Sequence, residues 1–224
     1  MFFFEHFVLS SRGRMGYSAR MIIAKEAWIP VIVLAVFAYV AWFVSPALTV
    51  FLSGLALFVL FFFRDPWRKV PEDRAVVVSP ADGTITDVRE VEWEGQPYRM
   101  VVIFLSVMNV HINRIPFSGT VVSTEHVLGD FHAAYKPDIE MANERMTTVL
   151  DTAKGRMKVV QIAGLIARKI INRLQVGQVV KTGERFGLIK FGSRTDVYLP
   201  VTATLLVKKS DKVWGGSTVI ARFS

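Results

Sequence analysis

The chain has 224 residues, which is enough for one domain of ordinary size and an appendage. It contains no cysteine, so disulfides, thiolate catalysis and cysteine-ligated metal sites are excluded. A net charge of +8 suits either nucleic acid or an anionic membrane surface. No nucleic-acid recognition motif is visible, and many of the cations flank an apolar run. The sequence therefore favours an anionic membrane surface as partner, and no nucleic acid.

The apolar run extends from Ile29 to Phe63 without a charged residue and follows an N-terminal segment, residues 1–27. It is too long for a single crossing of a bilayer, which takes roughly 20 helical residues. Ser45-Pro46 lies in its middle, and the residue before a proline is disfavoured in a helix. We therefore expect two short helices, 28–44 and 47–63.

These helices would form a membrane-anchoring hairpin over residues 28–63. Basic residues lie outside both ends of the apolar run, and basic flanks are typical of the cytoplasmic side. The pattern predicts a protein of the cell membrane whose remaining domain, residues 64–224, is cytoplasmic. Because each helix is near the lower length limit for a span, a shallow re-entrant hairpin in one leaflet is the alternative.

Beyond the hairpin, short runs rich in Val, Ile and Thr alternate with turn residues, which predicts a mainly β domain. The expected strands are 75–79, 83–88, 100–105, 119–123, 146–150, 158–162, 187–191, 196–199 and 203–207. Residues 133–142 alone hint at a helix or an ordered loop, and Pro137 interrupts them.

Two short patterns recur in this domain. Segments that begin at Pro80, Pro116 and Pro200 share Pro-x-x-small-Thr-aliphatic, and segments 177–183 and 210–216 share Gly/Ser-x-x-Val-x-x-Gly. Each is a turn that reverses a strand, so the repeats indicate hairpin modules with one common core. The turns resemble those of biotinyl- and lipoyl-type domains, without their modifiable lysine. We expect a barrel-sandwich-like β domain built from repeated hairpins, preceded by an N-terminal hydrophobic helical hairpin.

Four polar clusters could carry chemistry. Asp82 lies in a tight turn, His111 follows a hydrophobic strand, Asn143-Glu144-Arg145 precedes a strand, and Gly192-Ser193 lies between two strand-like runs. An Asp, a His and a Ser from separate segments can form a triad, in which the imidazole removes the hydroxyl proton. Taken singly, each has an ordinary structural interpretation as a turn aspartate, a core histidine or a loop serine.

The order of these clusters resembles that of the phosphatidylserine decarboxylases. Asp82 lies in Pro-Ala-Asp-Gly, His111 in Val-His-Ile-Asn-Arg, and the Asn143-Glu144-Arg145 triplet and Phe191-Gly192-Ser193 follow in the same order as in that family. The match runs from about Phe63 to the end of the chain and is similar to the short form found in bacteria and archaea. It implies a lipid carboxy-lyase acting on phosphatidylserine or archaetidylserine.

The resemblance further implies a zymogen that cuts itself between Gly192 and Ser193. The products would be a β chain, 1–192, and an α chain, 193–224, whose first residue becomes a pyruvoyl group. That group would form a Schiff base with the serine amine of the lipid and accept electrons as CO2 leaves. No metal and no pyridoxal phosphate would be needed, and a homodimer is plausible for the family.

In this interpretation His111 acts as the base, Asp82 orients it, and Ser193 is the nucleophile. Arg114, Asn143, Arg145 and Arg194 are candidates for binding the substrate, because arginine binds phosphate and carboxylate in a bidentate manner. The chain departs from the long bacterial forms at two places. Arg114 stands where they have a second histidine, and Phe-Gly-Ser-Arg stands where they have Leu-Gly-Ser-Thr.

A second Gly-Ser pair, Gly216-Ser217, carries the family letters Gly-Ser-Thr. Gly216 occupies the same place in its repeat as Gly183 in the other, which makes it a turn glycine, so Ser193 is the predicted cleavage residue. Two other functions stay open: a non-enzymatic membrane adaptor with a barrel-sandwich domain, and a pyruvoyl decarboxylase of a soluble amino acid. The apolar hairpin disfavours the latter, because a diffusible substrate needs no anchor.

Overall fold

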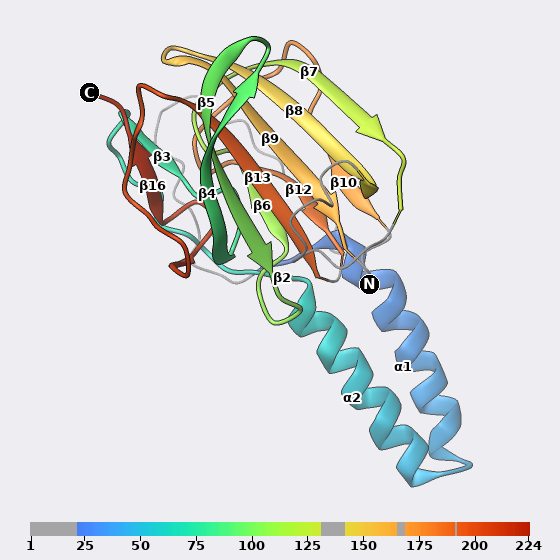
Figure 1. Ribbon diagram of the computed structural model, residues 1–224. Coiled ribbons are helices and arrows are strands. Elements are labelled where there is room, and N and C mark those ends of the chain that lie inside the picture. Colours follow the sequence, from blue (N-terminus) through green and yellow to red (C-terminus); the bar gives the residue numbers. More distant parts are fainter. Residues whose placement is uncertain (1–21, 131–141, 165–168, 191) are drawn as a thin grey trace, which may run out of the picture.

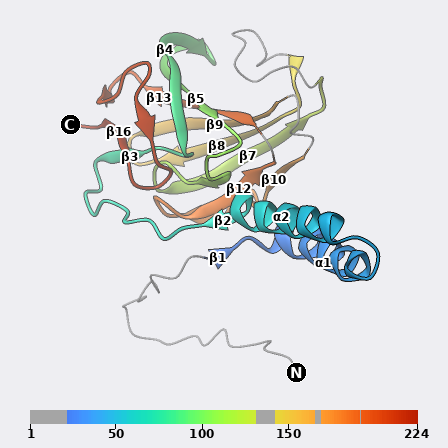
Figure 2. The ribbon, with the colours of Figure 1, turned by 90° about the horizontal axis from the view of Figure 1, so that it is seen from below.

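The computed structural model of the chain describes residues 22–130, 142–164, 169–190 and 192–224. A pair of helices projects from a β domain (Figure 1). A 3₁₀ turn, η1 (Lys25–Ala27), leads into α1 (Trp28–Trp42), and α2 (Pro46–Phe62) returns beside it, as Figure 2 shows. The predicted helical hairpin is confirmed, with helix ends within two residues of those expected.

The hairpin reverses where the sequence indicated. Ser45 has an extended backbone, and its hydroxyl accepts a hydrogen bond from the Leu48 N–H at 3.4 Å. Pro46 takes the first helical position, where its missing N–H leaves no hydrogen bond unmade. The two residues together therefore end one helix and begin the next.

Both helices present apolar side chains outwards rather than to the protein. Phe37 and Phe51 are 60% and 66% exposed. Together with η1, the first helix spans 18 residues, Lys25–Trp42, which is long and apolar enough to cross a membrane by length and composition; Pro46–Phe62 is shorter. A contiguous apolar surface of this kind marks a site of interaction.

The rest of the described chain is mainly β, as predicted. Each expected strand coincides with or overlaps an observed one. Seven short strands were not predicted, namely Ile22–Ile23, Arg64–Asp65, Ile112–Arg114, Ile170–Asn172, Val179–Val180, Lys212–Val213 and Val219–Arg222. The strands are β1 (Ile22–Ile23), β2 (Arg64–Asp65), β3 (Val76–Val78), β4 (Gly83–Trp93), β5 (Gln96–Leu105), β6 (Ile112–Arg114), β7 (Gly119–Val127), β8 (Arg145–Thr152), β9 (Gly155–Ala163), β10 (Ile170–Asn172), β11 (Val179–Val180), β12 (Arg185–Ile189), β13 (Ser193–Pro200), β14 (Thr204–Leu205), β15 (Lys212–Val213) and β16 (Val219–Arg222). The helix or ordered loop expected over 133–142 lies almost wholly outside the described residues.

The strands form one large sheet and three small ones. The large sheet has the order β11-β7-β8-β9-β13-β5-β4-β15, and the small ones are β10-β12-β6, β14-β16-β3 and β1-β2. The large sheet curls, so that its inner face meets the small sheets (Figure 1). Buried apolar side chains such as Ile103, Leu150, Phe186 and Val197 fill the space between them. This is the common core that the repeats predicted.

The two repeated patterns meet each other in the sheet. Gly83 and Thr84 of one Pro-x-x-small-Thr segment pair with Val213 and Lys212 of β15, and Gly119 and Thr120 pair in the same way with β11. β15 and β11 are the two edge strands of the large sheet. The sequence repeat is therefore a structural repeat that closes both ends of the sheet.

A buried carboxylate joins the hairpin to the β domain. Asp65, which is 4% exposed and lies in β2 just beyond α2, pairs with Arg114 of β6 at 2.7 Å and with Arg185 of β12. Arg114 is itself 6% exposed and also donates to the Gly183 carbonyl. The end of the hairpin is thus tied to two strands of one small sheet.

We expect Asp65→Asn to lower the free energy of unfolding by about 3–5 kcal/mol, because it leaves a buried guanidinium without its anion. Denaturant unfolding in detergent micelles would measure the change. Asp73→Asn is the matched control, since Asp73 pairs with the exposed Arg222 and its loss should change stability by about 0.5 kcal/mol or less. Equal effects of the two substitutions would contradict the structural role of Asp65.

Candidate active site

Ser193 is the first residue of a central strand. It pairs with Leu105 of β5 on one side and with Ala163 of β9 on the other. Just before it, Gly192 has a φ of +64°, a left-handed conformation that glycine adopts without strain. The Gly192–Ser193 bond therefore lies in the short link that leads from β12, in a small sheet, to β13, in the large one.

The hydroxyl of Ser193 has no hydrogen-bond partner among the residues that the structure describes, although the side chain is fully buried. Buried polar groups are nearly always paired, so an unpaired one needs an explanation. Reactivity is one such explanation, and it singles Ser193 out from the other buried hydroxyls of the site.

His111 faces the residue before this serine. Its Nδ1 lies 3.0 Å from the Asn109 carbonyl oxygen, and its Nε2 lies 3.3 Å from the Gly192 nitrogen. A carbonyl can only accept, so Nδ1 carries the proton, and Nε2 accepts from the Gly192 N–H. The basic nitrogen of a neutral imidazole is thus directed at the peptide next to the predicted cleavage site.

Burial keeps this imidazole neutral. His111 is 2% exposed, and desolvation lowers its pKa from 6.5 to about 4, against the opposing effect of the Asn109 carbonyl. The positive charge of Arg64 lowers the pKa further. His111 is therefore a free base at neutral pH, as a general base must be.

Asp82 does not contact His111. One carboxylate oxygen pairs with Arg68 at 2.6 Å, and the other accepts the Gly215 N–H at 2.7 Å. Burial raises the pKa of Asp82, while Arg68 opposes that shift. The orienting contact expected from Asp82 is made instead by the Asn109 carbonyl, a backbone group that leaves no signature in the sequence.

The three candidate arginines are engaged away from Ser193. Arg114 is ion-paired with Asp65. Arg194 is 3% exposed and bonds both oxygens of Asp196 at 2.7 Å. Arg145 and Arg194 are each paired in register with Ile162, so they share one face of the sheet. Because successive strand residues point to opposite faces, that face is not the one to which Ser193 points.

Asn143 and Glu144 lie just before β8, at the end of the sheet where β13 begins. The Asn143 amide donates to the Ala163 carbonyl at 2.7 Å, which supports the strand end opposite Ser193. Glu144, not expected as a site residue, lies 2.8 Å from the Nε2 of His126. Both belong to the predicted triplet. Asn143 supports the strand next to Ser193, and its amide makes no hydrogen bond to the serine hydroxyl.

A chain of buried amides and hydroxyls runs between the two sheets. Asn113 donates to Thr195 at 3.3 Å and accepts from Gln161 at 2.8 Å, and Asn172 donates to Gln161 and to Thr148. The chain begins two residues from Ser193 and ends at Asn172. Within the described ranges, no three His, Asp or Glu side chains gather closely enough to hold a metal ion.

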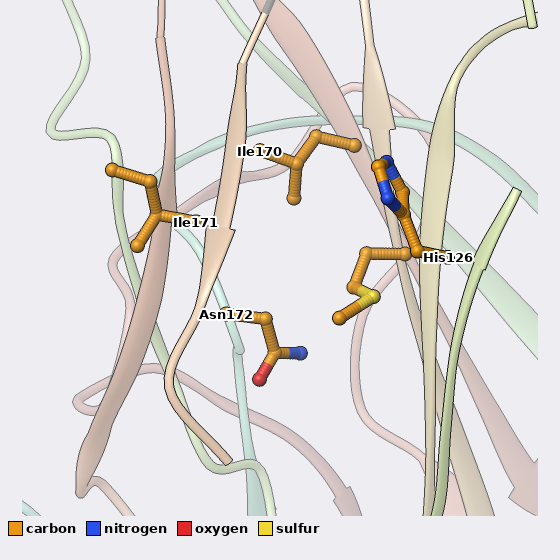
Figure 3. A pocket seen from close by; sticks show the side chains of 5 residues that line it. His126, Ile170, Ile171 and Asn172 are labelled. Carbon is orange, nitrogen blue, oxygen red and sulfur yellow. The ribbon is translucent and has the colours of Figure 1, made fainter. Parts of the chain in front are cut away.

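Asn172 lies at the wall of a hollow of about 230 Å³. Its lining includes Met146 of β8 as well as the labelled side chains of Figure 3. There, Asn172 and Ile170 from β10 lie on one side and His126 from β7 on the other. His126 and Gln161 are each paired in register with Met146, so the hollow opens on the inner face of the large sheet. Its wall on β8 is separated from β13 by one strand, β9.

The second Gly-Ser pair lies in a turn. Gly216 has a φ of +77° and Gly183 one of +79°, and a Cβ added to Gly216 would lie 3.6 Å from the Gly183 Cα. The Ser217 N–H donates to the Trp214 carbonyl within the same turn. The two glycines have equivalent roles in the repeat, as predicted, and Ser217 has no histidine beside it in the described contacts.

The low pKa of His111 makes stability depend on pH. The unfolded chain binds a proton on this imidazole near pH 6.5, whereas the folded chain binds it only near pH 4. The free energy of unfolding should therefore be highest above pH 6.5 and fall by up to about 3 kcal/mol towards pH 4. His111→Gln in a Ser193→Ala chain should flatten this slope in denaturant unfolding; an unchanged slope would show that His111 does not cause it.

Known proteins are similar to this chain over most of its length. A family model described as phosphatidylserine decarboxylase matches residues 55–221. A protein of Symbiobacterium thermophilum is 48% identical over 93% of this chain and 99% of its own length. Proteins of a Wolbachia from Brugia malayi and of Pelobacter propionicus are 40% and 48% identical over 90% and 75% of this chain, and 91% and 78% of their own lengths. All three are named phosphatidylserine decarboxylase proenzyme.

The family match includes Asp82, His111, Asn143 and Ser193, and the similarity to the first relative extends over almost the whole of both chains. The chain belongs to the phosphatidylserine decarboxylase family.

Proposed function

We propose that this chain is a membrane-bound phosphatidylserine decarboxylase that cuts itself between Gly192 and Ser193 and converts Ser193 into a pyruvoyl cofactor. The observation that carries the proposal is the Nε2 of His111, which lies 3.3 Å from the Gly192 nitrogen beside a buried, unpartnered serine hydroxyl. Membership of the family supports the reaction, and the word proenzyme in the names of the relatives is consistent with self-processing.

The surroundings of Ser193 fit such a group. Its hydroxyl makes no hydrogen bond within the described residues, so converting it sacrifices none there. The backbone of residue 193 is held on both sides, by Leu105 and by Ala163. A pyruvoyl group at this position would therefore remain at the head of β13, with the Asn143-supported strand end across from it.

In the proposed self-cleavage, His111 takes the hydroxyl proton and Ser193 Oγ attacks the Gly192 carbonyl carbon. The C–N bond breaks as the nitrogen receives that proton from His111 and becomes a free amine, and the acyl group moves to oxygen as an ester. Loss of the Ser193 α-proton then breaks the Cβ–O bond, which leaves a Gly192 carboxylate and a dehydroalanine. One water hydrolyses the corresponding imine, and ammonia departs.

His111 has the protonation state that this sequence needs. With Nδ1–H donating to the Asn109 carbonyl, only Nε2 is free to take a proton. Nε2 accepts from the Gly192 N–H, and it would have to leave that hydrogen bond to take the proton of the serine hydroxyl. Such contacts commonly tighten only during reaction.

The pyruvoyl group, once formed, supplies an electron-withdrawing carbonyl that takes up the electron pair as CO2 leaves. The chain's own contribution is to position and to move protons. His111 Nε2 is our candidate for returning a proton to the substrate carbon that loses CO2. The hollow beside His126 and Asn172 would admit the serine headgroup along the inner face of the sheet.

The apolar hairpin would hold the β domain at the bilayer, where that headgroup lies. Lys25 and Lys69 are exposed near the two ends of the hairpin and would face anionic headgroups. We propose that α1 and α2 are embedded in the cell membrane and that the β domain is cytoplasmic, since both outer ends of the hairpin are basic. A homodimer stays a prediction from the family resemblance.

Intact mass spectrometry of the purified chain should give two fragments, 1–192 and 193–224, the smaller without a free amino terminus. Ser193→Ala should stay whole, because it lacks the attacking oxygen. Ser217→Ala is the matched control and should be cut like the wild type. A single uncut wild-type chain under active conditions would overturn the cofactor and favour the adaptor; a cut after Gly216 would mean that the reactive serine is Ser217.

The lipid substrate should be strongly preferred over free serine. With phosphatidylserine in vesicles, CO2 release should exceed that from equal serine by about 10²-fold or more, because the anchor concentrates the enzyme at its substrate. Measuring both rates with the processed protein in the same vesicles separates a lipid enzyme from one that acts on a soluble amino acid. Equal rates would support the latter.

A further inference from the structure

The end of the membrane hairpin reaches the catalytic histidine. Phe62, the last residue of α2, is 1% exposed, and its ring centroid lies 4.3 Å from that of His111 with an interplanar angle of 34°. Figure 1 shows α2 entering the β domain at this point, beside β2. The contact therefore joins the apolar hairpin to the histidine that we propose as the general base.

The contact belongs to a larger apolar cluster at the base of the hairpin, which we call the seat. Side chains of the hairpin base pack with side chains on both sides of His111, from the loop before β6 and from β12. The cluster consists of Ala27, Val59, Phe62, Phe63, Val110, Ile112 and Leu188. The seat is further tied by Asp65 to Arg114 and Arg185. The position of Phe62 is therefore fixed with respect to the strands that carry His111.

We propose that Phe62 is a positioning residue that holds the His111 ring with Nε2 directed at Gly192, next to the Gly192–Ser193 bond, so that the apolar hairpin is part of the processing site as well as an anchor. The inference rests on the proposed self-cleavage. It assigns to the hairpin a role that membrane attachment alone would not require.

The geometry explains why a flat neighbour matters. The two hydrogen bonds of His111, to the Asn109 carbonyl and from the Gly192 N–H, lie at opposite nitrogens of the ring. Bonds at these two atoms leave the ring free to tilt about the line that joins them. Phe62 covers one face and limits that tilt, and a misplacement of about 1 Å can cost roughly a hundredfold in rate.

Phe62 also keeps water from the imidazole. Among the described residues, Arg64 of β2 is the charged group that acts on the pKa of His111, and it donates to the Met108 carbonyl. Lys190 belongs to the same region, with its ammonium 5.7 Å from the Phe63 ring. α2 contributes no charge to this contact. Removing the ring would admit water, favour the protonated imidazole and raise its pKa from about 4 towards 6.5.

The test compares phenylalanine substitutions within one helix, in the full chain reconstituted in vesicles. Phe62→Ala should lengthen the self-cleavage half-time roughly tenfold to a hundredfold at pH 7. The defect should deepen as the pH falls towards 5, where the variant's imidazole is protonated and the wild type's is not. Phe51→Ala, which removes a 66% exposed ring of α2, should stay within about twofold of wild type.

Phe62→Leu separates the ring from its apolar volume and guards against a variant that fails to fold. It should process more slowly than the wild type, because leucine fills the seat without presenting a flat face. Wild-type rates in Phe62→Leu, or a slowing in Phe62→Ala that is the same at every pH, would overturn the positioning role.

NMR titration of the His111 imidazole in a Ser193→Ala background gives a readout independent of cleavage. Adding Phe62→Ala should raise the His111 pKa, whereas adding Phe51→Ala should not. An unchanged pKa would overturn the inference even if the wild type processes normally. If the wild type never processes, the proposed function fails, and the titration still decides whether Phe62 shields His111.

Discussion

Strand β13 is hydrogen-bonded on both sides along most of its length, and the predicted cleavage site is its first residue. A reactive bond at the head of a central strand can be reached only from the link that precedes it. That link ends in Gly192, whose left-handed conformation turns the chain from one sheet to the other. His111, carried by the neighbouring small sheet, faces the same link. The layered arrangement of the sheets therefore determines which peptide bond the histidine meets.

Electrostatics separates the supporting residues from the reactive ones. Buried carboxylates pair with arginines, as Asp65 does with Arg114 and Asp196 with Arg194. A lone charge in such surroundings would be costly, so these pairs hold the scaffold in place. The surroundings of His111 have the opposite effect, because burial and the nearby Arg64 guanidinium lower its pKa and keep it uncharged. The interior of the β domain thus contains paired charges that support the fold, and a neutral imidazole beside the link that leads to Ser193.

Sequence patterns predicted what local chemistry determines. The uncharged run with Ser45-Pro46 predicted the hairpin, and the glycine repeat separated Gly216 from Gly192. Arg114 and Arg194 were candidates for binding the substrate because the sequence does not show which carboxylate each of them pairs with after folding. Asp65, the partner of Arg114, is far from it in sequence. Asp196, two residues after Arg194, was the available signal, since alternate strand residues share a face. The Asn109 carbonyl and the ring of Phe62 had none, because each acts through tertiary placement.

The link between β12 and β13 also determines what a cut would leave behind. Residues 193–224 contain the middle strand of the large sheet, its edge strand β15, and two strands of another sheet. In the uncut chain these strands would pair while covalently linked to the rest of the domain, which gives them a high effective concentration. Once severed, the short piece would have to find its place by diffusion. A processed molecule that unfolds should therefore seldom refold. The time for which it stays folded would be determined by the rate of unfolding rather than by the equilibrium between folded and unfolded states.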